Sequence, residues 1–535
     1  MAWTRAIGIG LRGMLHRRIA SLSDTDRWGR DAGSVQRRQL RWLLERAAGT
    51  EFGRAHSFAR LGRLGDGEIL DAYRAEVPVH SYLDLRPSLE RMRTEGSAGV
   101  TWPGVVRDWA QTSGTTAGDK FVPVSRDLLR HNMRAALDLY AHAARLGVSL
   151  PDVFAGKVLF LGGSTNLSEN EHGVRTGDLS GVITRMIRWP MSAVWLPGAD
   201  IALESDWPRK IDRMAERCLD EDVRWVSGMP SWTIVLFERV LEMARARGRG
   251  VSCIREIWPN LRLFVHGGVK YDPFARRVRA MWSGDPEGAD IPTRIEVYAA
   301  SEGFVATQDT ADDPGMRLNL DHRVFFEFVP SEQAGAADAP AFACDQVERG
   351  QRYVVVLSTC AGLWRYDIGD VVEFDTIPPA GPPRLRIVGR SKHFMNAFGE
   401  NIIAENVEIG VAEAAAQTRA TIGEFTAAPI FPADARPASI ELVIEWAGAT
   451  DPATIERFRD LFDASLRRQS NDYADKRAGG VGMGPVVVTA VAMGTFHRWL
   501  QSRGKLGGQH KCPRCAMDRR HVDEILEFAQ ATPAP

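Results

Sequence analysis

The sequence has little cysteine and lacks any long apolar run. Six cysteines among 535 residues are too few to form a disulfide framework. Basic residues interrupt the apolar residues near the start before the core of a secretory signal can form. No apolar run reaches the roughly 18 residues that a membrane span requires. We therefore expect a cytoplasmic, reduced protein without a membrane partner.

The chain also has no surplus of either charge. Its 67 Lys and Arg residues balance 68 Asp and Glu residues, and the formal net charge at pH 7 is -1. Without a basic surplus, nucleic acid is not an expected partner. Hydrophobic residues make up 44% and charged residues 25%, the balance of a globular protein with a substantial core. The length fits about three to four ordinary domains, or one large composite domain with a smaller one.

Helical spacing dominates the first part of the chain. Leu40, Leu43, Leu44 and Ala47 recur on one helical face before Gly49. A second long helix is predicted over 126–145. Its predicted apolar face consists of Leu129, Met133, Ala136, Leu137 and Tyr140.

Strands and helices then alternate. Short apolar runs predict strands at 158–161, 223–226, 261–265 and 294–298. Helices are predicted between them at 231–247 and 274–282. This order predicts an α/β fold in which crossover helices connect the strands of a parallel sheet. Ligands of such sheets bind beyond the carboxyl ends of the strands, so the polar turns there are the candidate site.

The texture changes near residue 390. Further strands are predicted upstream of it at 353–357, 371–374 and 385–388. Helices and strands alternate downstream, at 404–418, 440–446, 452–468 and 485–491. We expect a large N-terminal domain over 1–389, built on parallel or mixed sheets, and a small α+β C-terminal domain over 390–535.

One window, 111–120, has the composition of a phosphate-binding loop. Glycines let the backbone approach an anion, while N–H groups and hydroxyls surround its oxygens. The candidate phosphate contacts are Ser113, Gly114, Thr115, Thr116 and Gly118. Lys120 adds a mobile positive charge before the predicted helix. The spacing is not that of a Walker A motif. An ordinary polar turn is the alternative.

Two further stretches suit a nucleotide. Tyr298 ends a predicted strand and can stack on a planar base, and Glu302 can hold a hard cation such as Mg²⁺. Asp370, in a glycine turn between predicted strands, can accept both hydroxyls of a ribose. The alternatives are a core tyrosine, a solvated acid and a simple turn.

Taken together and in order, these stretches resemble the adenylate-forming superfamily of acyl-CoA synthetases, adenylation domains and luciferases. More narrowly, the chain resembles the acyl-acid amido synthetases of the Gretchen Hagen family, first known from auxin-responsive plant genes. The likeness runs over about residues 36–525. The narrower resemblance rests on Phe52-Gly53, Val77 to Leu85, Glu90-Arg91, Phe264 to Val269, Phe496 to Leu500, Ser502 to Gly504 and Gln509 to Arg514.

The resemblance implies an ATP-dependent ligase that uses Mg²⁺ to adenylate a carboxylic acid and transfers the acyl group to an amine, here expected to be an amino acid. Two alternatives stay open: transfer to coenzyme A or a carrier thiol, and a non-catalytic protein that binds nucleotide or acid.

The resemblance also assigns roles to further residues. It implies contacts to adenine by Gly267, Gly268 and Tyr298, with Ser301 in the same motif as Glu302. It implies a ribose contact by Arg390 beside Asp370, and a hinge over 390–392. Plant members carry an Asp-Lys-Thr segment where residues 399–402 here read Gly-Glu-Asn-Ile. The candidate lysines for the phosphate are then Lys392 and Lys511, of which we expect Lys511 to serve acyl transfer.

Overall fold

The chain divides into two units, each built from segments that are far apart in the sequence. The computed structural model describes residues 2–112, 120–162, 168–177, 179–184, 187–204, 206–268, 271–311, 313–336, 338–390, 394–395, 402–430, 437–448, 451–470, 473–474, 477, 483–503, 512–516 and 518–531. The first unit comprises Met1–Gly228, Ile257–Gly268 and Ile291–Ile387. The second comprises Met229–Glu256, Val269–Asp290 and Val388–Pro535.

Helices precede the first strand, as predicted. They are α1 (Ala2–Ser23), α2 (Thr25–Arg30), α3 (Ala32–Ala47), α4 (Glu51–Ala55), α5 (Phe58–Leu61), α6 (Ile69–Glu76) and α7 (Tyr82–Thr94). The predicted stripe of α3 is buried, with Leu40 and Leu44 fully inaccessible. Ser81 caps α7, and its backbone N–H donates to Asp84 Oδ2 at 2.7 Å. This capping box fixes where α7 begins.

A parallel set of strands forms one half of the main sheet. The predicted strands are found as β3 (Lys157–Phe160), β7 (Val223–Ser227), β8 (Leu263–Gly267) and β9 (Thr293–Ala300), joined at the edge by β6 (Trp195–Leu196). Each neighbouring pair among them is parallel, as predicted. Smaller elements along this part of the chain are α9 (Leu150–Val153), α10 (Leu179–Thr184), α11 (Ala199–Ala202) and α12 (Trp207–Cys218).

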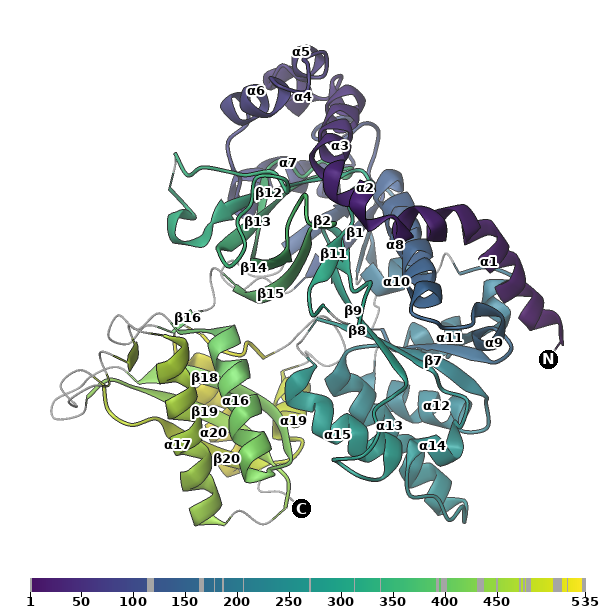
Figure 1. The fold of residues 1–535 in the computed structure, drawn as a ribbon, viewed down its shortest axis with the longest axis vertical. Coiled ribbons are helices and arrows are strands. Elements are labelled where there is room, and N and C mark those ends of the chain that lie inside the picture. Colours follow the sequence, from purple (N-terminus) through teal and green to yellow (C-terminus); the bar gives the residue numbers. More distant parts are fainter. Residues whose placement is uncertain are drawn as a thin grey trace. The chain divides into compact units, whose positions relative to one another are not determined.

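Mostly antiparallel strands extend the same sheet beyond β9 (Figure 1). They follow in the spatial order β10 (Gly303–Thr307), β11 (Met316–Leu318), β15 (Arg384–Arg390), β14 (Tyr366–Thr376), β13 (Arg352–Thr359) and β12 (Val324–Pro330). Of these, β13, β14 and β15 were predicted. Residues 331–350 form no strand where they are described, in line with their Ala- and Gly-rich composition.

The long helix α8 (Arg126–Arg145) has the predicted length but only part of the predicted buried face. Met133 is 54% exposed, whereas the inward face carries His131, Asp138 and His142, each at most 4% exposed. The prediction is partly correct: Leu129, Leu137 and Tyr140 pack against core clusters, whereas Met133 faces outward. The most deeply buried positions instead include polar groups that have hydrogen-bond partners. Helix α1 packs along α8, and Figure 1 shows the two side by side.

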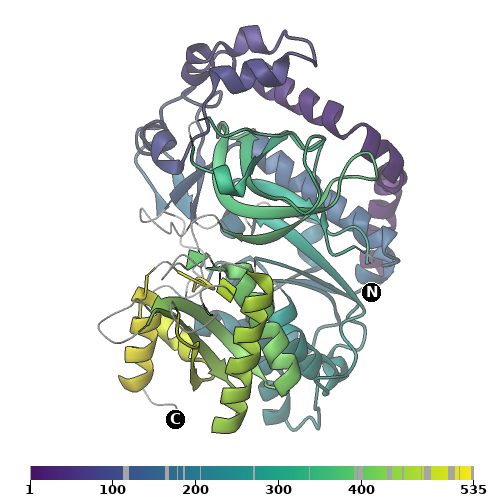
Figure 2. The same ribbon diagram turned by 60° about the vertical axis from the view of Figure 1, so that its left-hand side comes forward.

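The second unit contains a three-stranded sheet, β18 (Ile422–Ile430), β19 (Ser439–Trp446) and β20 (Val487–Ala492). Helices α16 (Ala404–Thr418) and α17 (Pro452–Gln469) cover the face of this sheet from which Ala427 and Leu442 project (Figure 2). Helices α19 (Thr495–Ser502) and α20 (Arg520–Ala531) cover the opposite face, from which Ala428 and Val443 project. Successive strand residues thus face opposite helical layers. The strands and helices predicted here are found, whereas β18 was not predicted.

Two predicted crossover helices belong to this second unit. They are α13 (Pro230–Ala246) and α15 (Asp272–Ser283), and α15 packs against α16 and β18. The short helix α14 (Ile254–Ile257) lies between them in the sequence. None of the six cysteines, all of which are described, forms a disulfide, as predicted. Among the described helices, none is both long and apolar enough to cross a membrane.

Candidate active site

Two glycines end β8 at the carboxyl edge of the parallel strands. Gly267 lies opposite Val297 of β9. A Cβ at Gly267 would stand 2.3 Å from the carbonyl oxygen of Val297, so no larger residue fits there. Gly268 has a φ of +81°, a conformation that favours glycine. The backbone therefore turns sharply away at the edge where ligands of such sheets bind.

The hairpin between β9 and β10 presents Glu302 at the same edge. Ala300 pairs with Gly303, so Ser301 and Glu302 form a two-residue turn. Both are buried, at 3% and 8% exposure. Because β8 and β9 are parallel, their carboxyl ends lie together, and this turn follows directly on β9. The predicted Tyr298 to Glu302 stretch is thus correctly placed at a strand end.

Tyr298 and Asp370 are in direct contact. The Tyr298 hydroxyl donates to Asp370 Oδ2 at 2.5 Å, and both residues are 4% exposed. Strands β10, β11 and β15 separate β9 from β14 in the sheet. On a flat sheet, four strand spacings would place them about 19 Å apart. The sheet must therefore curl, and the curl joins two of the predicted nucleotide-binding stretches.

Asp370 does not lie in a turn between strands, as the sequence suggested, but inside β14. Val354 and Val356 of β13 are two residues apart, but their partners in the antiparallel strand β14, Val371 and Asp367, are four residues apart. The extra residues form a bulge, and Gly369 within it has a φ of +82°. A bulge re-aims the side chains around it. That is how Asp370 can meet Tyr298 while its strand stays paired.

Lys120 begins the second strand of a small hairpin. Strand β1 (Asp108–Thr112) pairs with β2 (Lys120–Val124), and Thr112 lies opposite Lys120. Residues 113–119 therefore connect two strands, and β2 intervenes before α8, which the sequence prediction had missed. β1 also pairs with β5 (Arg175–Gly177), which pairs with β4 (Ser168–Glu169).

The lysine side chain reaches β14. Lys120 Nζ lies 3.4 Å from the Tyr366 hydroxyl, to which it donates a hydrogen bond. It also lies 5.8 Å from the centre of the Tyr82 ring, within range of a cation–π contact. Tyr366 is the first residue of β14, and Asp370 lies four residues further along it. One strand thus contacts both Lys120 and Tyr298.

A short segment before α7, which includes His80, pairs with the start of β14. His80 lies beside Tyr366 as an added strand residue: its N–H donates to the Arg365 carbonyl at 2.8 Å, and its own carbonyl accepts from Asp367. Burial lowers the pKa of its imidazole, whose Nδ1 lies 2.8 Å from the Trp364 carbonyl. Nearby, the Tyr82 hydroxyl accepts the Phe121 N–H.

No structural role was predicted for this segment or for Tyr366. The signal for the segment was present, because His80 lies within the family-like stretch Val77 to Leu85.

Several predicted residues lie outside the described part of the chain. These are Ser113, Gly114, Thr115, Thr116, Gly118, Lys392 and Lys511. Arg390 ends β15, but its side chain also lies outside the described part. Of the predicted residues, the structure joins Tyr298 to Asp370 and places Lys120, from the smaller sheet, against Tyr366 of the same strand. Gly267 and Glu302 lie at the carboxyl ends of β8 and β9 in the main sheet.

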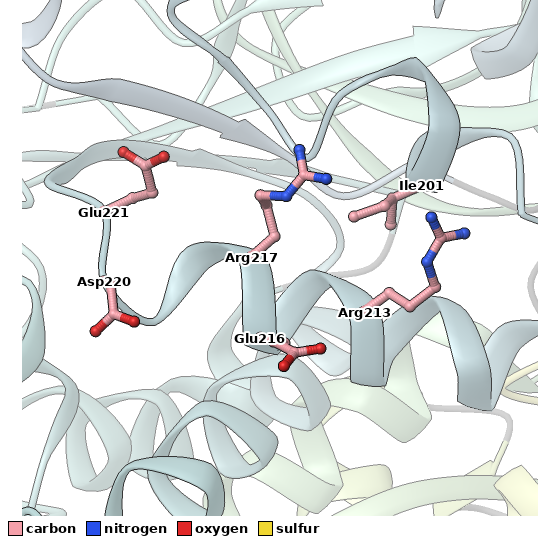
Figure 3. A pocket seen from close by; sticks show the side chains of 6 residues that line it. All are labelled: Ile201, Arg213, Glu216, Arg217, Asp220 and Glu221. Atoms are coloured by element: carbon pink, nitrogen blue, oxygen red, sulfur yellow. The ribbon is translucent and has the colours of Figure 1, made fainter. Parts of the chain in front are cut away.

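A separate surface pocket of about 350 Å³ contains none of the predicted residues (Figure 3). It is lined by Ile201, Arg213, Glu216, Arg217, Asp220 and Glu221. Arg213 and Arg217 both bond Asp200 Oδ2, at 3.2 and 3.4 Å. Because these guanidinium groups already have a carboxylate partner, the pocket is not a candidate for a phosphate ligand.

Comparison with family models gives three matches in chain order. The GH3 family N-terminal domain matches residues 22–200, the central domain 318–390 and the C-terminal domain 405–520. Together they cover more than half of the chain, and the central match contains the whole of β14.

Curated relatives span almost the same length. The indole-3-acetic acid-amido synthetase GH3.8 of Oryza sativa subsp. indica is 24% identical, over 93% of this chain and 90% of the relative. The jasmonoyl–L-amino acid synthetase JAR6 of Nicotiana attenuata is also 24% identical, over 91% of each. Among solved structures, the GH3.15 acyl acid amido synthetase has a TM-score of 0.74 at 17% identity and 96% coverage of both chains. The fold is therefore that of this enzyme.

Proposed function

The chain belongs to the GH3 family, and from that premise we propose that it is an acyl-acid amido synthetase. It adenylates a carboxylic acid with ATP, releases pyrophosphate, and transfers the acyl group to the amine of an amino acid. The observation that carries this proposal is the convergence on β14. Lys120, beside the phosphate-type loop, bonds Tyr366, and Tyr298 bonds Asp370 four residues further along.

The chemistry requires activation, because a carboxylate does not exchange its oxygen for an amine at neutral pH. In the first step a carboxylate oxygen bonds to the α-phosphorus of ATP, and the bond from that phosphorus to pyrophosphate breaks. In the second step the amine nitrogen bonds to the acyl carbon, the acyl–oxygen bond breaks and AMP departs, while the amine loses a proton. No covalent enzyme nucleophile is needed, so catalysis rests on positioning and charge stabilisation.

The residues of the first unit divide these tasks. Lys120 and the 113–118 loop hold the β- and γ-phosphates, and Asp370 accepts the ribose hydroxyls. We assign the adenine to the glycines at the end of β8, Gly267 and Gly268, and to the Tyr298 ring. Burial supports these roles, because Tyr298, Glu302 and Asp370 are each at most 8% exposed and charged contacts are stronger away from water.

Glu302 has the chemistry that Mg²⁺ selects. Magnesium is commonly held by one or two carboxylates together with substrate phosphates, and Glu302 is a buried acid on a two-residue turn. A magnesium ion bound there would neutralise charge on the phosphates. We include ATP and Mg²⁺ in the proposal on this basis.

We assign the second half-reaction to the C-terminal part of the chain. The proposed small domain over 390–535 rotates about residues 390–392, as segments between domains commonly do. Arg390 supports the ribose, while Lys392 and Lys511 are the phosphate-facing cations. The transfer step is assigned to Lys511 because it lies in a basic segment beyond the proposed hinge and far in sequence from the phosphate loop.

The experiment is a product screen. The protein is incubated with ATP, Mg²⁺, panels of carboxylic acids and amino acids, and in parallel with coenzyme A, and the products are identified by mass spectrometry. We expect an N-acyl amino acid with AMP. A thioester without amide would reassign the acceptor. No acid-dependent loss of ATP across the panels would favour a binding protein.

A further inference from the structure

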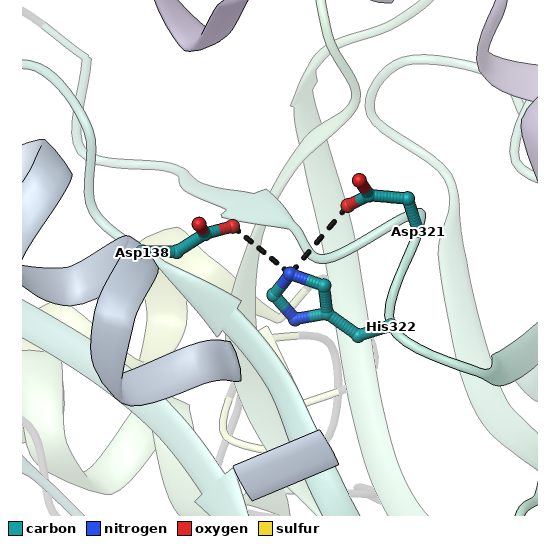
Figure 4. A group of neighbouring side chains, drawn as sticks. All are labelled: Asp138, Asp321 and His322. Atoms are coloured by element: carbon teal, nitrogen blue, oxygen red, sulfur yellow. Dashed lines mark hydrogen bonds and ion pairs between the residues drawn. The ribbon is translucent and has the colours of Figure 1, made fainter. Parts of the chain in front are cut away.

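A buried charge cluster connects α1, α8 and the loop before β12. His322 Nε2 lies 2.9 Å from Asp138 Oδ2 and 3.5 Å from Asp321 Oδ1 (Figure 4). This set of one imidazole and two carboxylates would suit a metal ion. The guanidinium of Arg18, from α1, bonds both carboxylates at 2.5 and 2.8 Å. The cluster already holds its cation, so it is an internal ion pair.

The cluster orients the inward face of α8. Burial favours the neutral form of Asp138, but hydrogen bonds from Arg18 and His322 outweigh it and keep its pKa below the ordinary value. His131 lies seven residues earlier, two turns along the same face of the helix. It is fully buried. The side chains of Asp138 and His131 thus both contact His322, Asp138 through the imidazole and His131 through the backbone carbonyl.

The surroundings of His131 fix which ring nitrogen carries the proton. Nδ1 lies 2.6 Å from the carbonyl oxygen of His322, which can only accept. Nε2 lies 2.7 Å from the backbone N–H of Phe304, which can only donate. The ring is therefore neutral, with its proton on Nδ1. Burial, with the nearby His322, lowers the pKa of His131 to about 3, in agreement with this assignment.

Phe304 follows Glu302 by two residues and is held from both sides. His131 accepts its N–H, and Asn319 Nδ2 donates to its carbonyl at 3.2 Å. The β9–β10 register shifts between Phe304 and Ala306, so regular pairing on the Glu302 side of this shift is short. The side chains of His131 and Asn319 therefore hold Phe304 where the regular hydrogen bonds between the two strands are interrupted.

We propose that His131 is a positioning residue that fixes the hairpin turn bearing Glu302. This rests on the proposed function, in which Glu302 holds Mg²⁺ with ATP. The acceptor at Nε2 sets the position of Phe304, and through it the direction of the Glu302 carboxylate. Partners that orient a metal-binding group commonly change metal affinity about tenfold or more when they are removed.

The test compares two amides of different reach at position 131. In His131→Gln the side-chain oxygen reaches the place of Nε2 and can accept the Phe304 N–H. In His131→Asn it reaches only the place of Nδ1. The readout is the dissociation constant of ATP, by calorimetry on the full chain, with Mg²⁺ and with EDTA. The magnesium ratio, defined as the constant with EDTA divided by the constant with Mg²⁺, reports how well Mg²⁺ is held.

We expect His131→Asn to lower this ratio by about tenfold, while His131→Gln keeps the wild-type ratio. A merely structural residue would lower the thermal stability of both variants and leave the ratio unchanged, which overturns the proposal. Equal loss in both variants also overturns it, because the acceptor would then not matter.

Glu302→Gln is the control for the underlying function. If this variant keeps the wild-type ratio, Glu302 does not hold Mg²⁺ and the proposed magnesium role itself fails. If the ratio falls in Glu302→Gln but stays at the wild-type value in His131→Asn, only the role of His131 is wrong. Should His131→Asn not fold, Asn319→Ala removes the other anchor of Phe304. An unchanged ratio in Asn319→Ala would then contradict the proposal.

Discussion

Replacing Tyr298 with Phe removes a hydroxyl and keeps the aromatic ring, so it separates two roles of this residue. The hydroxyl donates to Asp370 at 2.5 Å, and both residues are 4% exposed. A hydrogen bond to a charged group contributes about 1.5–3 kcal/mol. If that energy serves to hold Asp370 toward the ribose, ATP affinity in Tyr298→Phe falls by about 10- to 100-fold.

The assay is a double-mutant cycle on ATP binding, measured by calorimetry. The variants are Tyr298→Phe, Asp370→Ala and the double variant. Because the hydroxyl acts through the carboxylate, Tyr298→Phe should cost nothing further once Asp370 is Ala. A strongly non-additive cycle is therefore the expected result.

Two results would refute this reasoning. An unchanged ATP affinity in a folded Tyr298→Phe protein would make the pair a structural contact only. Equal losses with and without Asp370 would mean that the hydroxyl meets ATP by another route. Tyr298→Leu, which also removes the ring, measures the stacking that we assign to the adenine.

Three further outcomes follow from the same account. Lys120→Ala should lower acid-dependent pyrophosphate release by about tenfold or more, and unchanged release in the folded variant would contradict its role. Lys511→Ala should still release pyrophosphate in a single turnover but form amide slowly; equal loss of both steps would indicate a shared phosphate role. Burial raises the pKa of Glu445 from 4.5 to about 7, so the native carboxyl keeps a proton that the unfolded chain loses. Unfolding free energy should thus fall by about 3 kcal/mol as pH rises from about 4.5 to 7, and denaturation curves of Glu445→Gln should lack this fall; parallel pH curves would contradict it.

Local patterns predicted much of the fold. The parallel strands have short apolar runs followed by glycine or polar turns, and those signals lie within a few residues of each other. Strand β18 escaped prediction because it includes Ala427, Ala428 and Pro429, which have low strand propensity. It becomes a strand by pairing with β19 between two helical layers.

The candidate site was predictable as stretches but not as an arrangement. Tyr298 and Asp370 are 72 residues apart, and only the curl of the sheet joins them. The inward face of α8 was assigned to apolar residues because spacing alone cannot show that a buried histidine and aspartate have partners. Those partners come from distant parts of the chain, Arg18, Phe304 and His322.

The most direct test of the central claim is the fate of a carboxylate oxygen. The protein is supplied with ATP, Mg²⁺, an amino acid and a carboxylic acid from the product screen, labelled with ¹⁸O in its carboxylate. If the acyl group passes through an adenylate, one labelled oxygen leaves with AMP and the amide keeps the other. Mass spectrometry should therefore find AMP carrying a single ¹⁸O together with the N-acyl amino acid. Amide formed with unlabelled AMP, or with label in inorganic phosphate and release of ADP, would contradict the account.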